Sequence, residues 1–111
     1  MVDKILTSVG IPCAETAFAQ QPDGVYAVWG ERIEADGSDY GAELLRHDVT
    51  VEVYEPAEHV GREERRRLIE ALDDRYRAGL IGRWSCDMRV WLLDVRLYLT
   101  TYTFSYIERR S

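Results

Sequence analysis

The chain has few cysteines and no long apolar run, the features that cross-link small secreted proteins and anchor membrane proteins. Its two cysteines, Cys13 and Cys86, form no Cys-x-x-Cys motif and have no neighbouring histidine, which argues against a disulfide framework and a zinc site. No apolar run approaches the roughly 20 residues of a membrane span, and the N-terminus lacks the apolar core and cleavage site of a signal peptide. We therefore expect one soluble, intracellular domain over residues 1–111 with free thiols.

Lysine is almost absent from the sequence. The chain has a single lysine, Lys4, and thirteen arginines. The 20 acidic residues outnumber the 14 basic ones, which gives a net charge of −6. This balance disfavours a protein that neutralises nucleic-acid phosphates or docks on anionic lipid, since both functions need a basic face. The arginine preference has two explanations: codon bias of the genome, or a protein interface, where the guanidinium fork is favoured.

Hydrophobic periodicity predicts six elements. Apolar residues three and four apart predict helices, and alternating apolar and polar residues predict strands. The expected helices cover residues 2–9 and 60–78, and the expected strands cover 25–29, 45–54, 83–92 and 96–107. Residues 13–24 show neither pattern, and the turn-forming residues at 36–39 make 30–41 a hairpin connection.

The resulting element order, α-β-β-α-β-β, indicates an α+β fold. Each pair of strands is joined by a short connection, so the simplest arrangement is a mostly antiparallel four-stranded sheet with two helices packed on one face. The most regular strand, 45–54, places His47, Val49, Val51 and Val53 on one side, which we expect to be the buried side.

The last expected strand has no solvated face. Its odd positions are aliphatic residues and threonines that suit helix packing, whereas its even positions form an aromatic row: Tyr98, Tyr102, Phe104 and Tyr106. A chain of this size has no third layer to cover that row, and an exposed apolar stripe usually marks an interface. We therefore expect the row to contact other subunits. The alternative is ordinary cross-strand packing with neighbours such as Trp91.

The sequence contains no catalytic or metal-binding motif. His47 and His59 are not linked by a metal-ligand spacing, and His47 falls on the buried side of its strand, where a hydrogen-bonded structural histidine is expected. We therefore expect no enzyme, no cofactor and no metal ion. A nucleophile such as Cys86 beside a histidine would need a contact across the fold, which the sequence does not reveal.

Acidic residues crowd the expected hairpin connection. Five acids between positions 31 and 43 surround Arg32 and contribute −4 to the net charge, without the Asp-x-Asp-x-Asp-Gly pattern of a calcium loop. We expect a solvated hairpin that docks on a basic partner surface; the alternative, in a ring, is a lining that repels DNA. The candidate contact residues are Glu31, Glu34, Asp36, Asp39 and Tyr40.

Six segments carry a family resemblance through their order and spacing. They are Gly-Ile-Pro-Cys-Ala at 10–14, Val-Tyr-Ala-Val-Trp at 25–29, Ala-Asp-Gly-Ser-Asp-Tyr at 35–40, Val-Thr-Val-Glu-Val-Tyr at 49–54, the expected helix at 64–72 and Leu-Tyr-Leu-Thr-Thr-Tyr-Thr-Phe at 97–104. In this order, the segments resemble the small tail-completion or tail-terminator (head–tail joining) proteins of long-tailed bacteriophages and prophages. The resemblance covers about residues 10–107.

This resemblance implies a structural virion protein and not an enzyme. Such proteins form a ring, commonly hexameric, that caps the tail tube and docks it to the head connector or neck protein. The implied partners are other copies of the chain, the tail tube protein and the head connector. No membrane and no specific nucleic-acid binding are implied, although DNA passes through the ring. The implied location is the tail or neck of the virion, and the host cytoplasm during assembly.

Two other functions stay open on the sequence alone. One is a non-viral adaptor or toxin-neutralising module that binds a basic partner through the acidic hairpin. The other is a small enzyme that uses Cys86 or His47. Neighbouring genes for portal, capsid and tail-tube proteins would favour tail completion, and a neighbouring toxin gene would favour the adaptor.

Overall fold

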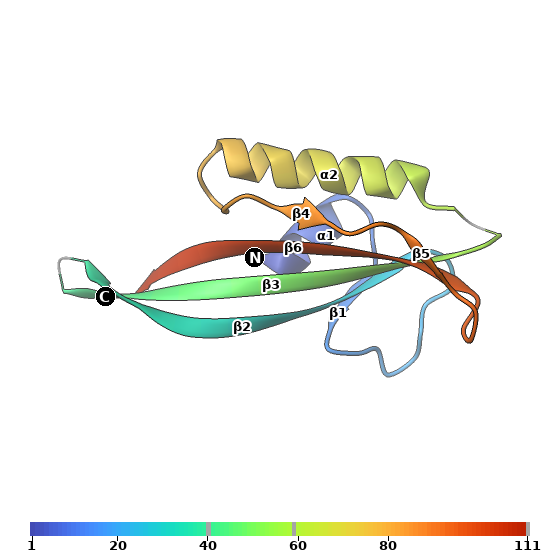
Figure 1. The fold of residues 1–111 in the computed structure, drawn as a ribbon, viewed down its shortest axis with the longest axis horizontal. Helices are drawn as coiled ribbons and strands as arrows, with labels where there is room; N and C mark the ends of the chain where they lie inside the picture. The colour runs from blue at the N-terminus through green and yellow to red at the C-terminus, as the bar shows by residue number, and fades with distance from the viewer. Residues whose placement is uncertain (40, 59, 111) are drawn as a thin grey trace.

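A computed structural model describes residues 1–39, 41–58 and 60–110 of the chain. Two helices and six strands follow one another along these residues (Figure 1). In chain order they are α1 (Val2–Ser8), β1 (Cys13–Glu15), β2 (Tyr26–Asp39), β3 (Ala42–Pro56), α2 (Arg62–Arg77), β4 (Ser85–Cys86), β5 (Val90–Leu92) and β6 (Leu97–Arg110).

The strands form one mixed sheet in the order β1-β2-β3-β6-β4, with β5 also paired to β6. The long strands β2, β3 and β6 are antiparallel neighbours, whereas β1 runs parallel to β2. The expected four-stranded sheet with the order α-β-β-α-β-β is therefore wrong. Its error has two sources, the short strand β1 and the division of residues 83–92; the β2–β3 hairpin is also longer than expected.

β1 lies in the segment that showed no periodicity, because three residues are too few to alternate. Backbone hydrogen bonds fix it: the Ala27 amide donates to the Pro12 carbonyl over 2.9 Å, and the Thr16 amide donates to the Trp29 carbonyl over 2.8 Å. The expected strand 83–92 is divided into β4 and β5. Between them Arg89 turns inward, where its guanidinium lies 4.3 Å from the centre of the Tyr98 ring.

The expected connection 30–41 is mostly strand. β2 and β3 pair from Tyr26 opposite Tyr54 to Asp39 opposite Ala42, with a register shift between Ala35 and Ser38. Gly37 in this bulge has a φ of 95°, a conformation that glycine adopts without a side-chain clash. β6 also continues beyond its expected end at 107, because residues 108–110 pair with β3.

Both expected helices are confirmed, and they contact each other. α1 buries Val2, Ile5 and Leu6, while α2 buries Leu68 and Leu72. These side chains share one hydrophobic cluster with Val49, Val51 and Val53 of β3, so the predicted buried side of this strand is also confirmed.

Two residues of the aromatic row of β6, Tyr102 and Phe104, belong to this core. Tyr102 is 1% exposed and Phe104 is 5% exposed, and they lie opposite Val51 and Val49 on the face that the helices cover. The expectation that the row forms an uncovered face is therefore wrong. Both sets of β6 positions are rich in apolar groups, and the opposite set, which includes Thr101 and Thr103, faces away from the helices.

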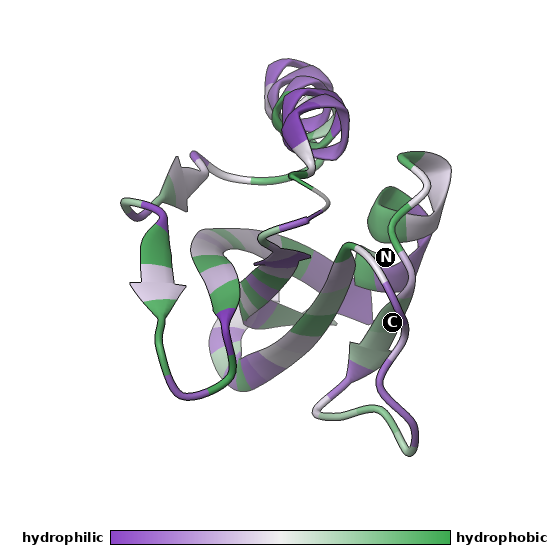
Figure 2. Cartoon of the chain, turned by 90° about the vertical axis from the view of Figure 1, so that its right-hand side faces the viewer, coloured by the Kyte–Doolittle hydropathy of each residue, from purple (hydrophilic) through white to green (hydrophobic). Residues whose placement is uncertain are grey.

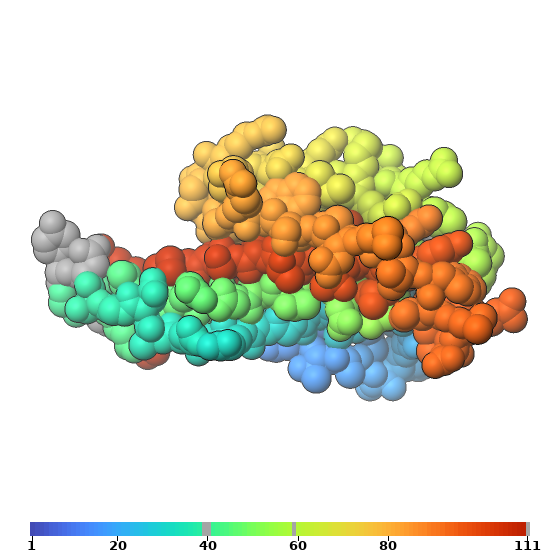
Figure 3. All heavy atoms as spheres, viewed as in Figure 1, coloured from blue at the N-terminus to red at the C-terminus, as the bar shows by residue number. Residues whose placement is uncertain are grey.

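The helix layer covers only part of the sheet. α2 has 16 residues, about 24 Å at 1.5 Å per residue, whereas β3 has 15 residues, about 50 Å at 3.4 Å per residue. The sheet therefore extends past α2 at one end, as Figure 3 shows, and the molecule measures 52 × 28 × 22 Å. We call this end the distal sheet: residues 30–39 of β2, 42–48 of β3 and 105–110 of β6.

The burial of Phe104 can be tested by truncation. We expect Phe104→Ala to lower the free energy of unfolding by about 3–5 kcal/mol, because it leaves a cavity beneath the helices. The control is Thr50→Ala, an exposed position on the opposite face, which should cost under about 1 kcal/mol. Urea denaturation of both variants measures the difference. An equal loss of unfolding free energy in the two variants would show that Phe104 does not lie on the core face.

Candidate functional site

The acidic residues of the distal sheet point to both of its faces. Glu31 lies on the face that the helices cover elsewhere, because it is opposite Val49, and its carboxylate contacts His47. Glu34 has the opposite parity and forms an ion pair with Arg32 on the other face. Asp36 is exposed beside the bulge. The acids expected to form one docking cluster are therefore divided between two faces.

The last two candidates of this segment are placed differently. Asp39 is the final residue of β2 and pairs through its backbone with Ala42. Tyr40 lies outside the described residues, so its predicted contact role stays a prediction.

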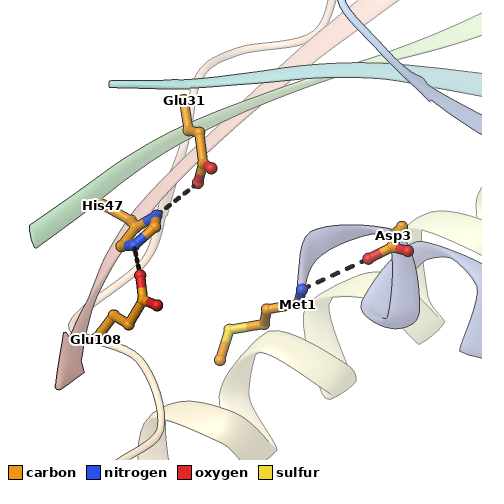
Figure 4. Close-up of polar contacts among 5 residues, drawn as sticks. All are labelled: Met1, Asp3, Glu31, His47 and Glu108. Atoms are coloured by element: carbon orange, nitrogen blue, oxygen red, sulfur yellow. Dashed lines mark hydrogen bonds and ion pairs between the residues drawn. The ribbon is translucent and has the colours of Figure 1, made fainter. Parts of the chain in front are cut away.

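His47 connects the three strands of the distal sheet (Figure 4). Its Nδ1 lies 2.9 Å from Oε2 of Glu31 on β2, and its Nε2 lies 2.7 Å from Oε1 of Glu108 on β6. The imidazole also stacks on the ring of Tyr106, with centroids 4.3 Å apart and planes at 11°. The residue is 6% exposed, which confirms the expectation of a buried, hydrogen-bonded histidine. Its two carboxylate partners were not predicted.

The electrostatics of this cluster favour a charged imidazole. Burial lowers the pKa of His47, but the hydrogen bonds and charges of Glu31 and Glu108 outweigh it and raise the pKa above its ordinary value. With both ring nitrogens facing carboxylates, the imidazolium can donate two hydrogen bonds at once. Burial, followed by the charges of the same carboxylates, raises the pKa of Tyr106 to about 12.

The cluster is built as a structural clamp. The two carboxylates contact opposite nitrogens of one ring, so they do not converge with the imidazole on a common point. Within residues 1–39, 41–58 and 60–110, no group of three His, Cys, Asp or Glu side chains is placed to hold a metal ion. Cys86 is exposed, and Cys13 is half-buried, with burial raising the pKa of its thiol.

A second charged cluster lies at the other end of β3. Glu55 is fully buried, and its Oε1 accepts a hydrogen bond from the Gly61 amide over 2.8 Å. Nε of Arg65 lies 3.3 Å from the same oxygen. A methyl group on Gly61 would lie 2.7 Å from Cγ2 of Val25, so this approach requires glycine. These contacts fix the start of α2 against the sheet.

The proximal end of the molecule, opposite the distal sheet, exposes apolar side chains around the β5–β6 connection. Met88, Val90, Trp91, Leu93 and Val95 are all exposed, and Figure 2 shows β5 and this connection largely in the hydrophobic colour. An open cleft of about 710 Å³ lies beside them, lined among others by Tyr26, Pro56 and Leu97. The remaining aromatic candidate, Tyr98, packs here, with its ring centroid 4.7 Å from that of Trp91.

This apolar end was missed by the sequence interpretation. The expected strand 83–92 would have placed Met88 and Val90 on its apolar side, whereas the structure exposes both. The available signal was the apolar run Leu92-Leu93, directly before Asp94 in a turn. No helix of the described residues is both long enough and apolar enough to cross a bilayer.

The comparisons with known proteins include a likeness to a solved structure. No protein-family model matches the chain, and no curated protein is significantly similar to it. Among solved structures, the fold is similar to a chain in the virion of a native gene transfer agent particle. The TM-score is 0.54 and the identity 16%, over 94% of this chain and 84% of that chain. The chain therefore shares its fold with a component of a virion.

The clamp predicts a pH dependence that can be measured directly. Because the folded-state pKa of His47 is raised, its contribution to stability is fully present below about pH 6.5, the ordinary histidine value. It is lost as the pH rises through the raised pKa. We expect the His47 ring to titrate above 6.5 by NMR, and Glu31→Gln to lower its pKa. A ring that titrates at or below 6.5 in the folded protein would contradict the clamp.

Proposed function

We propose that this chain is a structural protein of a phage-like virion that completes the tail. In this proposal copies of the chain form a ring that caps the tail tube and docks it to the head connector. The observation that carries it is the shared fold with a virion chain over 94% of the sequence. The ordered motifs that resemble tail-completion proteins support the same role.

The shape of the molecule suits a position between two different partners. Its distal end carries exposed acidic residues such as Asp36, and its proximal end carries exposed apolar residues such as Leu93. These two chemistries recognise different surfaces: an acidic edge suits a basic partner, and apolar side chains suit an apolar one. A protein that joins two assemblies needs two such ends.

The role requires contacts and no reaction. Among the described residues, the buried charged side chains His47 and Glu55 are used in structural contacts that connect strands or fix a helix. The functional surfaces in this proposal are therefore the two ends of the sheet.

Deletion of the gene, with complementation, tests the proposal. Without the chain, we expect filled heads and free tails instead of joined particles, counted by negative-stain electron microscopy. Wild-type protein should restore joining. The variant Glu34→Lys/Asp36→Lys should restore it about tenfold less well or worse, because like charges across an interface cost several kcal/mol.

A matched control separates docking from net charge. Glu70→Lys/Asp74→Lys makes the same change in charge on the exposed side of α2, and it should restore joining like the wild type. Normal joining without the chain would refute the tail-completion role and leave the adaptor that binds a basic partner. Equal activity of both double variants would refute docking through the hairpin.

A further inference from the structure

The outer edge of β2 is unpaired along the distal sheet. β1 pairs with β2 only at residues 27–29, and no other strand of the described residues covers that edge. The hydrogen bonds of Ala27 and Trp29 with residues 12 and 16 show that odd-numbered backbone groups point outward. By the same alternation, the amides and carbonyls of Glu31, Ile33 and Ala35 point away from β3. They form a regular edge that ends at the bulge.

The opposite edge of the sheet, along β6, is not covered by a described strand at the same end. The carbonyls of Thr101 and Ser105 accept hydrogen bonds from the amides of Asp87 and Gly82 over 2.9 and 2.7 Å, so odd-numbered groups again point outward. β4 pairs with β6 only as far as Thr103. The next outward-facing residue beyond Ser105 is Ile107, and no strand of the described part of the chain lies against it.

The two edge strands run in the same direction, and their uncovered residues lie at the same level along the strand axis. β2 and β6 both run antiparallel to β3, so they are parallel to each other. Ile107 and Glu34 are both paired with Arg46, which places Ile107 level with the gap between Ile33 and Ala35. A second copy beside the first can therefore add its β2 to the first copy's β6, in parallel and without a shift along the strands.

Side chains at the two edges favour another copy as the occupant. Ile33 is 51% exposed and Ile107 is 50% exposed, although exposed sheet edges are usually protected by charge, proline or a bulge. Residues 31–39 contain four acids and one arginine, whereas residues 108–110 contain one acid and two arginines. Pairing β6 with β2 joins unlike charges, while pairing β2 with β2 would join two acidic edges.

We propose that the β6 edge of one copy pairs with the β2 edge of the next at the distal sheet. The two patches differ, so the contact is heterologous and repeats from copy to copy, closing a ring when the rotation allows it. This inference rests on the proposed function for the ring and names the surface that forms it.

Edge prolines test the pairing. Ile33→Pro and Ile107→Pro each replace an outward-facing amide, so no hydrogen bond to β3 is lost, and the proline ring occupies the position of a neighbouring strand. We expect each variant alone to be monomeric by sedimentation velocity up to about 1 mM. Their equimolar mixture should give a heterodimer and nothing larger, because one intact edge of each kind remains.

The controls show whether the variants fold and whether side chains matter. Ile33→Val and Ile107→Val keep the amides and should associate within about threefold of the wild type. Circular dichroism should show native spectra for both proline variants, and the heterodimer requires both to be folded. Wild-type protein that stays monomeric at about 1 mM, or proline variants that assemble like the wild type, would overturn the edge pairing.

These outcomes are separable from the proposed function. Assembly by both proline variants, with tails still unjoined after gene deletion, would reject the edge and keep the tail-completion role. If the proline substitutions abolish self-association but heads and tails still join after gene deletion, the edge pairing is supported and the tail-completion role is rejected.

Discussion

The packing of Tyr102 and Phe104 of β6 beneath the helices determines the shape of this protein. Tyr102 and Phe104 fix the core under a 16-residue helix, while the strands that carry the core are twice as long as this helix. The helices cannot cover the whole face, so one end of the sheet extends beyond them as three strands. The free edges and the exposed acids of the distal sheet follow from this mismatch in length.

An uncovered three-stranded sheet needs another source of stability, and the His47 clamp provides one. A single imidazole joins β2, β3 and β6 through Glu31 and Glu108 and stacks on Tyr106. It lies two residues before Val49 in β3, on the same face, where the hydrophobic core ends. Charge pairing thus replaces apolar packing along the sheet, and two edges stay available for contact.

The sequence was sufficient to predict a helix or strand where one face of the element is clearly more apolar than the other. Apolar spacing therefore predicted α2, and alternation of apolar and polar residues predicted β3. The same alternation predicted the burial of His47. In β6 both faces carry apolar groups, so alternation could not tell which set, that of Tyr102 or that of Leu99, lies under the helices. The carboxylate partners of His47 are 16 and 61 residues away, and only the strand register brings them together.

Amide hydrogen exchange across the distal sheet is the most direct test of this account. In the dilute protein, the outward-facing amides of Ile33 and Ala35 should exchange fast, while those of Arg32 and Glu34, which face β3, should exchange slowly. When the protein is assembled on tail tubes, the account predicts that the two fast amides become protected and the slow ones do not change. Fast exchange at Ile33 and Ala35 in both states would contradict the claim that the uncovered end of the sheet is the contact surface.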